Sequence, residues 1–245
     1  MALEYIPLLQ KQLELYRIPV GPARFDAYIK LVVGEAKKSQ DVILPPFVRA
    51  NPMAKQHAFE HVKALLELGA EDMASRTMQQ AQSQLDIQEN FKVSTVLLDD
   101  LKGGWTNRYL NEAKDYFQAA DSVKKIGWIS VPYWTKDEPS VLAVKQNVLA
   151  YIFRTMYVLK HGNPRTLGNV MKQEGLTLKF ANVPQWLEPD DVAYSLSVIT
   201  PYLDSEHYPT QFACLFGDEA AKAVGYPALG LSARAGFAVA LKHFL

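Results

Sequence analysis

Two carboxylates and two glycines stand together at the point where a short apolar run ends. The run Val93–Leu98 is rich in β-branched residues and predicts a strand, which Asp99 and Asp100 follow directly. Gly103 and Gly104 come next and permit a tight turn. In α/β proteins such a strand-to-helix turn is a usual place for ligands, because strand carboxyl ends and helix amino ends meet there. The loop after residue 98 is therefore the best candidate for a ligand site.

The residues that open the following helix suggest what this ligand would be. Arg108 can hold a carboxylate or phosphate, Trp105 can cover a ring, and Asn107 lies beside helix-start amides that favour an anion. The sequence thus predicts a protein that binds or transforms a small polar or anionic metabolite. The alternative is structural. In that case Thr106 or Asn107 caps the helix, Arg108 pairs with Glu112 one turn later, and Trp105 packs into the core.

A lysine in the longest apolar segment could complete the same site. Residues Glu138 to Lys160 are apolar nearly all round and predict the most buried helix of the fold. Lys145 shares the apolar stripe of this helix, so its ammonium is expected to turn inward towards Asp99 or Asp100. The alternative is a lysine whose stem lies on apolar surface while its ammonium reaches solvent.

A second pattern, HAFEH, occupies residues 57–61. Two imidazoles one helical turn apart can share a zinc ion, and a glutamate between them can act as a base on zinc-bound water. The H-x-x-E-H spacing resembles that of the inverted zincin metallopeptidases, over five residues and one distant glutamate. The resemblance implies His57, His61 and Glu138 as zinc ligands and Glu60 as the general base.

Helical periodicity gives a different interpretation of this segment. At about 100° per residue, His57 and Glu60 fall opposite the apolar face, with His61 at its margin. That face is formed by Phe59, Val62, Leu65, Leu66 and Gly69. A solvent-facing surface predicts no metal here, and the sequence predicts no cofactor elsewhere. The zinc-dependent hydrolase stays an alternative.

Two further patterns lack an essential part. Residues Gly225 to Ser232 have the glycine spacing of a phosphate-binding P-loop, but Leu231 stands where the lysine is needed. The only cysteine, Cys214, lies among apolar neighbours, where a thiol is usually unreactive. We expect an interhelical loop and a core residue, respectively.

The composition of the chain indicates which classes of partner and which cellular compartment to expect. The chain has 26 basic and 26 acidic residues, so no net charge attracts a nucleic acid. A single cysteine permits no intramolecular disulfide. Glu4 stands where a signal peptide carries positive charge, and the longest apolar segment holds charged residues that disfavour a membrane span. We therefore expect a soluble, cytoplasmic protein with no nucleic-acid or membrane partner.

The segment patterns predict a predominantly helical α+β fold in a single globular domain, residues 1–245. Leu3 to Tyr16 and Phe25 to Val33 predict an opening helical pair, and the proline-rich residues 41–52 predict a surface linker after it. Helices are also expected at Met53 to Leu68 and Asp72 to Leu85. Three short runs predict strands, of which the first two would form a βαβ unit: Val93–Leu98, Gly127–Trp134 and Leu176–Ala181.

Three function classes remain open at this stage. The first is a protein that binds or transforms a small polar metabolite at the loop after residue 98. The second is a non-catalytic interaction or structural protein, and the third is a zinc hydrolase at residues 57–61.

Overall fold

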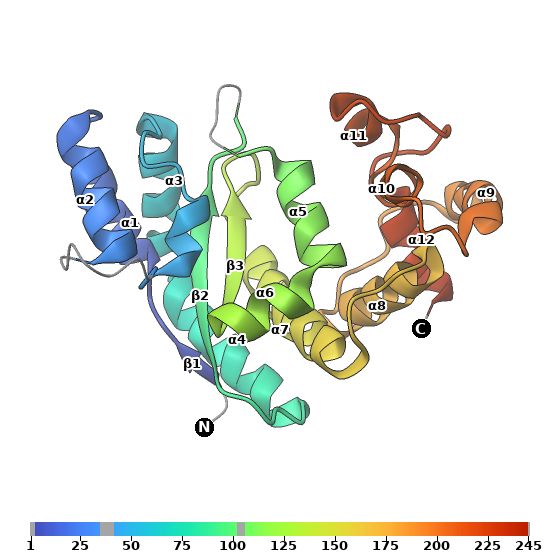
Figure 1. Cartoon of the computed structure of the whole chain (residues 1–245), viewed down its shortest axis with the longest axis horizontal. Coiled ribbons are helices and arrows are strands. Elements are labelled where there is room, and N and C mark those ends of the chain that lie inside the picture. Colours follow the sequence, from blue (N-terminus) through green and yellow to red (C-terminus); the bar gives the residue numbers. More distant parts are fainter. Residues whose placement is uncertain (1–2, 35–41, 102–105, 245) are drawn as a thin grey trace. The chain divides into compact units, whose positions relative to one another are not determined.

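The structure is a computed structural model that describes residues 3–34, 42–101 and 106–244. Helices account for 62% of it, and its strands form one three-stranded parallel sheet (Figure 1). The predicted class, a predominantly helical α+β fold with a small sheet, is confirmed. Contacts divide the chain into two compact units: unit 1 is Met1–Arg108 with Val123–Ile152, and unit 2 is Tyr109–Ser122 with Phe153–Leu245.

The sheet of unit 1 has the order β1-β2-β3, with β2 (Phe91–Leu98) in the centre. It pairs in parallel with β3 (Trp128–Trp134), from Lys92 opposite Trp128 to Leu98 opposite Trp134. Lys92 is the one exposed residue of β2, which explains why this strand reads as a continuous apolar run. Both strands lie where the sequence predicts them, and the chain between them passes through two helices, as in a βαβ unit.

The third strand differs from the prediction. It is β1 (Leu3–Tyr5), which pairs with Phe91–Val93 and lies in a segment predicted to be helical. Only three residues long, β1 is too short to show a period of two, and its pairing partner lies far along the chain. The predicted strand Leu176–Ala181 is wrong, because all but its last residue belongs to helix α8 (Leu167–Phe180).

Four complete α-helices and a short 3-10 helix accompany the sheet in the described part of unit 1, which also contains parts of two further helices, residues 123–126 and 141–152. Helix α1 packs against β2 and α3, and α4 packs against β1 and β2. The 3-10 helix η1 contacts β2 and β3 and buries Phe47 completely, whereas Val42 and Ile43 are exposed, so the segment predicted as a surface linker at 41–52 packs against the sheet in part. The complete helices are α1 (Leu9–Arg17), α2 (Pro22–Val33), η1 (Pro45–Arg49), α3 (Gln56–Glu67) and α4 (Ala70–Gln84).

Helix α7 (Val141–His161) corresponds to the segment predicted as the most buried helix, and that prediction is wrong. Its first two residues, Val141 and Leu142, are 43% and 58% exposed. Helices α10 and α12 of unit 2 are buried more continuously, with six consecutive buried residues in each. Apolar composition alone therefore does not determine which helix is the most buried.

Unit 2 is built around an aromatic helical core. Helix α12 packs against α8, α9 and α10, and it approaches α10 so closely that a Cβ on Gly236 would lie 2.4 Å from the Cys214 carbonyl oxygen. Phe212, Phe216 and Phe237 form the centre of this core. The remaining helices are α5 (Arg108–Phe117), α6 (Ala119–Ile126), α9 (Pro189–Ile199), η2 (Thr200–Tyr202), α10 (Tyr208–Phe216), α11 (Asp218–Ala223) and α12 (Ala235–His243).

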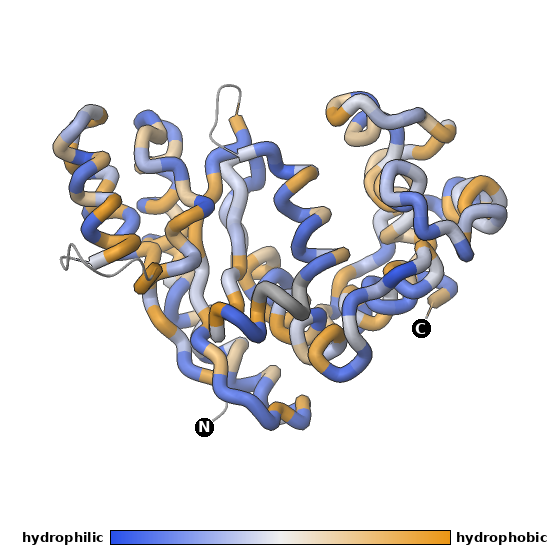
Figure 2. Tube along the Cα trace, in the orientation of Figure 1, coloured by the Kyte–Doolittle hydropathy of each residue, from blue (hydrophilic) through white to orange (hydrophobic). Residues whose placement is uncertain are grey.

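Hydrophobic and hydrophilic residues alternate along the helices rather than forming one long apolar stretch (Figure 2). Within the described ranges, no helix combines the length and apolar character that crossing a membrane requires.

Candidate functional site

The polar residues of interest gather at the carboxyl edge of the sheet in unit 1. Asp99 and Asp100 follow the last residue of β2, and Thr135 follows the last residue of β3. Because the two strands are parallel and Leu98 lies opposite Trp134, these three side chains come from adjacent strand ends. The position is the one that the sequence pattern predicts for a ligand site.

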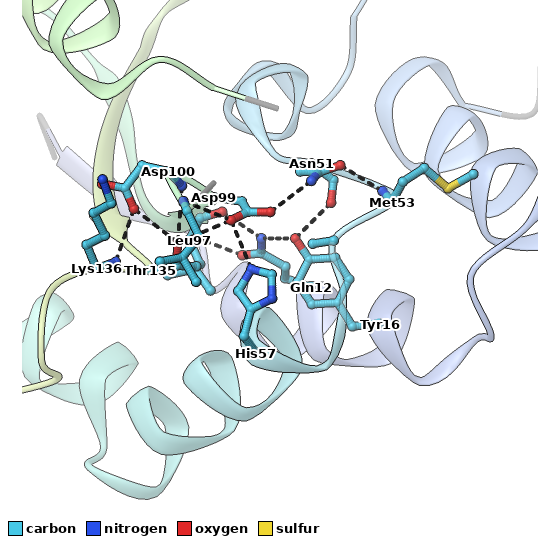
Figure 3. Close-up of polar contacts among 12 residues, drawn as sticks. Gln12, Tyr16, Asn51, Met53, His57, Leu97, Asp99, Asp100, Thr135 and Lys136 are labelled. Carbon is cyan, nitrogen blue, oxygen red and sulfur yellow. Dashed lines mark hydrogen bonds and ion pairs between the residues drawn. The ribbon is translucent and has the colours of Figure 1, made fainter. Parts of the chain in front are cut away.

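Asp99 is the centre of the hydrogen-bond network at this edge (Figure 3). One carboxylate oxygen, Oδ1, lies 2.9 Å from His57 Nε2 and accepts from the Thr135 hydroxyl at 3.2 Å. The other, Oδ2, accepts from Asn51 Nδ2 at 2.9 Å. Burial by itself raises the pKa of the Asp99 carboxyl, but the hydrogen bonds from His57 and Asn51 outweigh burial and lower that pKa. Asp99 is therefore ionised at neutral pH.

This charge state fixes the tautomer of His57. An ionised carboxylate only accepts hydrogen bonds, so His57 Nε2 carries the proton that Asp99 Oδ1 receives. In the neutral imidazole the lone pair is then on Nδ1. The His57 side chain is 34% exposed, whereas that of Asp99 is 4% exposed. The pair thus combines a buried anion with an imidazole that solvent or a ligand can reach.

Asp100 is held by Thr135 and Lys136, the two residues that follow β3. Its Oδ1 accepts from the backbone N–H of Lys136 at 3.0 Å and lies 3.0 Å from the Thr135 hydroxyl, whose single proton is shared between Asp99 and Asp100. Thr135 consequently links the two neighbouring carboxylates. Asp100 Oδ2 is buried and accepts no hydrogen bond, and its closest described cation is Arg108 Nη1 at 3.5 Å. A buried carboxylate oxygen without a hydrogen bond is costly and is seldom retained without a reason.

Arg108 forms the outer part of the site. Its guanidinium donates to both oxygens of the Asp137 carboxylate, at 2.6 and 2.9 Å, and its Cζ lies 5.3 Å from the centre of the Trp134 ring. Glu112, which the sequence analysis offers as an alternative partner of Arg108, accepts from Arg234 within unit 2. The pairing of Arg108 with Glu112 stays a prediction.

Residues of helix α1 and of the segment before α3 form hydrogen bonds that hold this edge of the sheet. The buried side-chain amide of Gln12 bonds both the N–H and the C=O of Leu97, at 2.9 and 2.8 Å, and also donates to Tyr16. The Tyr16 hydroxyl donates in turn to the backbone oxygen of Asn51 at 3.0 Å. Because Asn51 is fixed in this way, its amide is pre-oriented towards Asp99. No sequence pattern points to these supporting residues, because Gln12, Tyr16 and Asn51 are far from Leu97 and Asp99 along the chain.

The remaining residues predicted for this site have different outcomes. Gly103, Gly104 and Trp105 lie outside the described residues. Asn107 is exposed at the start of α5. Lys145 lies on the exposed face of α7, so its predicted inward turn towards the aspartates is wrong. The buried stripe of that helix begins one position earlier, at Val144, and continues with Val148.

In the HAFEH segment, His57 does not face solvent as periodicity predicts, whereas Glu60 is exposed and His61 lies at the margin of the buried face, as predicted. His57 turns to Asp99, because it lies in the first turn of α3, next to the carboxyl end of β2. His61 is half-buried, and desolvation lowers its pKa more than the nearby Asp137 and Glu138 raise it. Glu60 is exposed and accepts from Gln56. Among the residues that the structure describes, no three His, Cys, Asp or Glu side chains are arranged to hold a metal ion.

In the loop Gly225 to Ser232, which has the glycine spacing of a P-loop, the backbone amides bind the carboxylate of Asp218. Asp218 Oδ1 accepts from the backbone N–H groups of Leu229, Gly230 and Leu231 at 2.9, 3.1 and 3.0 Å. These bonds lower the pKa of Asp218 despite the opposing effect of burial. The amides that a phosphate would need are thus engaged by a side chain of the protein. Cys214 is fully buried, and burial raises the pKa of its thiol to about 12, as expected for an unreactive core residue.

No family model, curated protein or solved structure matches this chain. The residues at the carboxyl edge must therefore be interpreted from their own geometry.

Proposed function

We propose that the protein binds a small polar metabolite at the carboxyl edge of the sheet and transfers a proton to or from it through His57. The observation that carries this proposal is the 2.9 Å hydrogen bond between His57 Nε2 and a buried, ionised Asp99. A carboxylate in this position fixes the orientation and the tautomer of the imidazole ring. His57 Nδ1 would be the atom that takes or gives the proton.

The rigidity of Asp99 supports a catalytic rather than a purely structural use of this pair. Three side chains from three separate segments hold its two oxygens, and one of these donors, Thr135, also fixes Asp100. A general acid–base group gains from such pre-organisation, since its orientation need not be re-established in the transition state. A histidine that served only to fill space would not require an acid held so firmly.

Arg108 gives the site a means to orient a ligand. Its guanidinium makes a cation–π contact with Trp134 and lies 3.5 Å from Asp100, which the Thr135 hydroxyl connects to Asp99. A polar or anionic group of the ligand held there would place a neighbouring atom near the imidazole. The proposal therefore assigns binding mainly to Arg108 and proton transfer to His57, with Asp99 as its positioning residue.

The test begins with a thermal-shift screen of small polar and anionic metabolites against the wild-type protein. Each compound that raises the melting temperature is then measured by calorimetry with Arg108→Ala, His57→Gln and, as a matched control, the exposed Arg17→Ala. We expect Arg108→Ala to lose binding and Arg17→Ala to retain it. His57→Gln should bind the compound but convert it about 100- to 10,000-fold more slowly. If every such compound binds both Arg108→Ala and His57→Gln as tightly as wild type and no conversion depends on His57, the proposal is wrong.

The state of His57 gives a test that needs no ligand. In ¹⁵N-labelled protein, long-range correlation spectra distinguish the two neutral tautomers of an imidazole. We expect the Nε2–H tautomer in the wild type and loss of this preference in Asp99→Ala. A predominant Nδ1–H tautomer in the wild type would contradict the assigned proton position.

A further inference from the structure

We infer that the Asp137 carboxylate occupies on Arg108 the place of an anionic group of the ligand, a carboxylate or a phosphate. The inference deepens the proposed function and rests on it, because it concerns the same edge of the sheet. In this arrangement Asp137 is an internal competitor that the ligand displaces.

Asp100 and Asp137, two carboxylates that lie within ion-pair distance of Arg108, differ in their freedom to move away from it. The Asp100 side chain is 2% exposed and its Oδ1 is held by Thr135 and Lys136, so it stays in place. The Asp137 side chain is 49% exposed and belongs to the turn that follows β3. Asp100 is thus a permanent inner counter-ion at 3.5 Å, and Asp137 is an outer counter-ion. Because water competes with Arg108 for Asp137, this exposed ion pair contributes little to the stability of the fold.

The geometry of the outer pair matches that of a ligand anion. Two N–H groups of one guanidinium donate in parallel to the two oxygens of one carboxylate, the fork arrangement with which arginine recognises carboxylates and phosphates. Arg108 Cζ also lies 5.3 Å from the centre of the Trp134 ring, a cation–π contact that helps to hold the guanidinium in place. The Arg108 side chain is 22% exposed, so part of it is in contact with solvent.

The position of the pair connects it to the proposed chemistry. Arg108 lies 3.5 Å from Asp100, the Thr135 hydroxyl joins Asp100 to Asp99, and Asp99 holds His57. An anionic group that replaces Asp137 would therefore be anchored beside the proton-transfer pair. Displaced Asp137 can enter solvent at little cost, since half of its side chain is already exposed.

The decisive experiment compares Asp137→Asn with Glu138→Gln. Both variants remove one negative charge from adjacent exposed positions, but only the first removes the competitor. Binding of inorganic phosphate and of acetate is followed by NMR through the Arg108 side-chain Nε–Hε signal, at constant ionic strength. Because an exposed ion pair contributes up to about 1 kcal/mol, we expect Asp137→Asn to bind at least one of the two probes about three- to fivefold more tightly than wild type. Glu138→Gln should change that affinity much less. The probe that gains more identifies the anion as phosphate or carboxylate.

Arg108→Lys keeps the positive charge without the fork and should bind both probes more weakly than wild type. Equal affinities in wild type and Asp137→Asn would overturn the inference, as would equal gains in Asp137→Asn and Glu138→Gln, which indicate a general charge effect. These results would leave the proposed proton transfer intact as long as His57 keeps the Nε2–H tautomer. If that tautomer is lost while the Asp137→Asn gain is observed, the binding inference stands and the proton transfer fails.

Discussion

Two arginines of this protein hold a carboxylate through two hydrogen bonds each, and their surroundings are opposite. In unit 2, Arg154 donates to both oxygens of Glu174 at 2.7 Å, with side chains that are 5% and 0% exposed. In unit 1, Arg108 donates to Asp137, whose side chain is 49% exposed. The hydrogen-bond pattern is the same, so any difference in behaviour comes from solvent.

The buried pair is enclosed by further fixed groups. Gln173 donates to Glu174 at 2.9 Å and to the backbone oxygen of Tyr116 at 3.0 Å. The Arg154 guanidinium lies over the Tyr116 ring at 4.5 Å. Neither partner can leave without exposing the other to an apolar core, where an isolated charge is very costly. Such a pair fixes the packing of helices α7 and α8 and has no freedom to exchange partners.

The ion pair between Arg108 and Asp137 is weakened by water, because it is exposed to solvent. Its arginine is anchored on Trp134 and Asp100, whereas its outer carboxylate lies in a turn. The comparison teaches that a bidentate arginine indicates a binding function only where its partner is dispensable. The same substitution, carboxylate to amide, can be made in both pairs and measures this difference directly.

The largest effect is expected in the buried pair. Glu174→Gln leaves the Arg154 charge without its counter-ion in the core, and breaking a buried pair in this way costs about 3–5 kcal/mol of the free energy of unfolding. Urea denaturation followed by circular dichroism measures the loss. Glu206→Gln, an exposed change of the same type in unit 2, is the control and should cost about 0.5 kcal/mol or less.

A second variant distinguishes two causes of the lost stability, the unpaired charge of Arg154 and the missing hydrogen bonds. The double change Arg154→Met, Glu174→Leu replaces the whole pair by apolar side chains. It should recover most of the stability that Glu174→Gln loses, because no unpaired charge remains. A double variant as unstable as the single one would show that the network with Gln173, rather than charge burial, determines the cost.

An intermediate effect is expected at Asp99, and it should depend on pH. The pKa of Asp99 is lowered in the folded protein, so its contribution to stability is present above the ordinary value of about 3.9 and is lost as the pH falls through the lower folded value. At pH 7 we expect Asp99→Asn to cost about 1–3 kcal/mol, the range for hydrogen bonds to a charged group.

The difference in unfolding free energy between wild type and Asp99→Asn should then shrink as the pH is lowered towards 3. The control is Asp26→Asn, a substitution at an exposed position of α2. A difference at Asp99 that stays constant from pH 7 to pH 3 would contradict the assigned ionised state. It would also remove the basis for placing the proton on His57 Nε2.

The sequence predicted the parts of this fold that local pattern determines. The strands β2 and β3 were found because each is an apolar run of seven or eight residues, which is long enough to recognise. The strand β1 was missed because three residues carry no usable period, and its identity depends on pairing with Phe91–Val93. Helix α8 was mistaken for a strand at Leu176–Ala181 for a related reason, since six residues do not distinguish a buried strand from part of a helix.

The candidate site was predicted in part. Asp99, Asp100 and Arg108 were identified because they flank one loop, but their partners His57, Asn51 and Asp137 are 42, 48 and 29 residues distant from them. Thr135 could have been found, because parallel strands bring their carboxyl ends to one edge and Thr135 follows the second strand. His57 was noticed for a different chemistry, since its spacing from His61 suggested zinc while only the fold shows Asp99 beside it.

The smallest effect is expected at the exposed pair and completes the comparison. Asp137→Asn removes one half of a bidentate pair, as Glu174→Gln does, but water and Asp100 remain available to Arg108. The expected cost is about 0.2–1 kcal/mol, several times less than for Glu174→Gln, and it should decrease further in high salt because exposed charges are screened. Urea denaturation at low and high sodium chloride measures the loss in unfolding free energy and its dependence on salt, with Glu138→Gln as the control for the charge change. If Asp137→Asn destabilised the protein as much as Glu174→Gln, Asp137 would be a structural partner of Arg108. An incoming anion could then not displace it, and the guanidinium would be part of the scaffold rather than of a binding site.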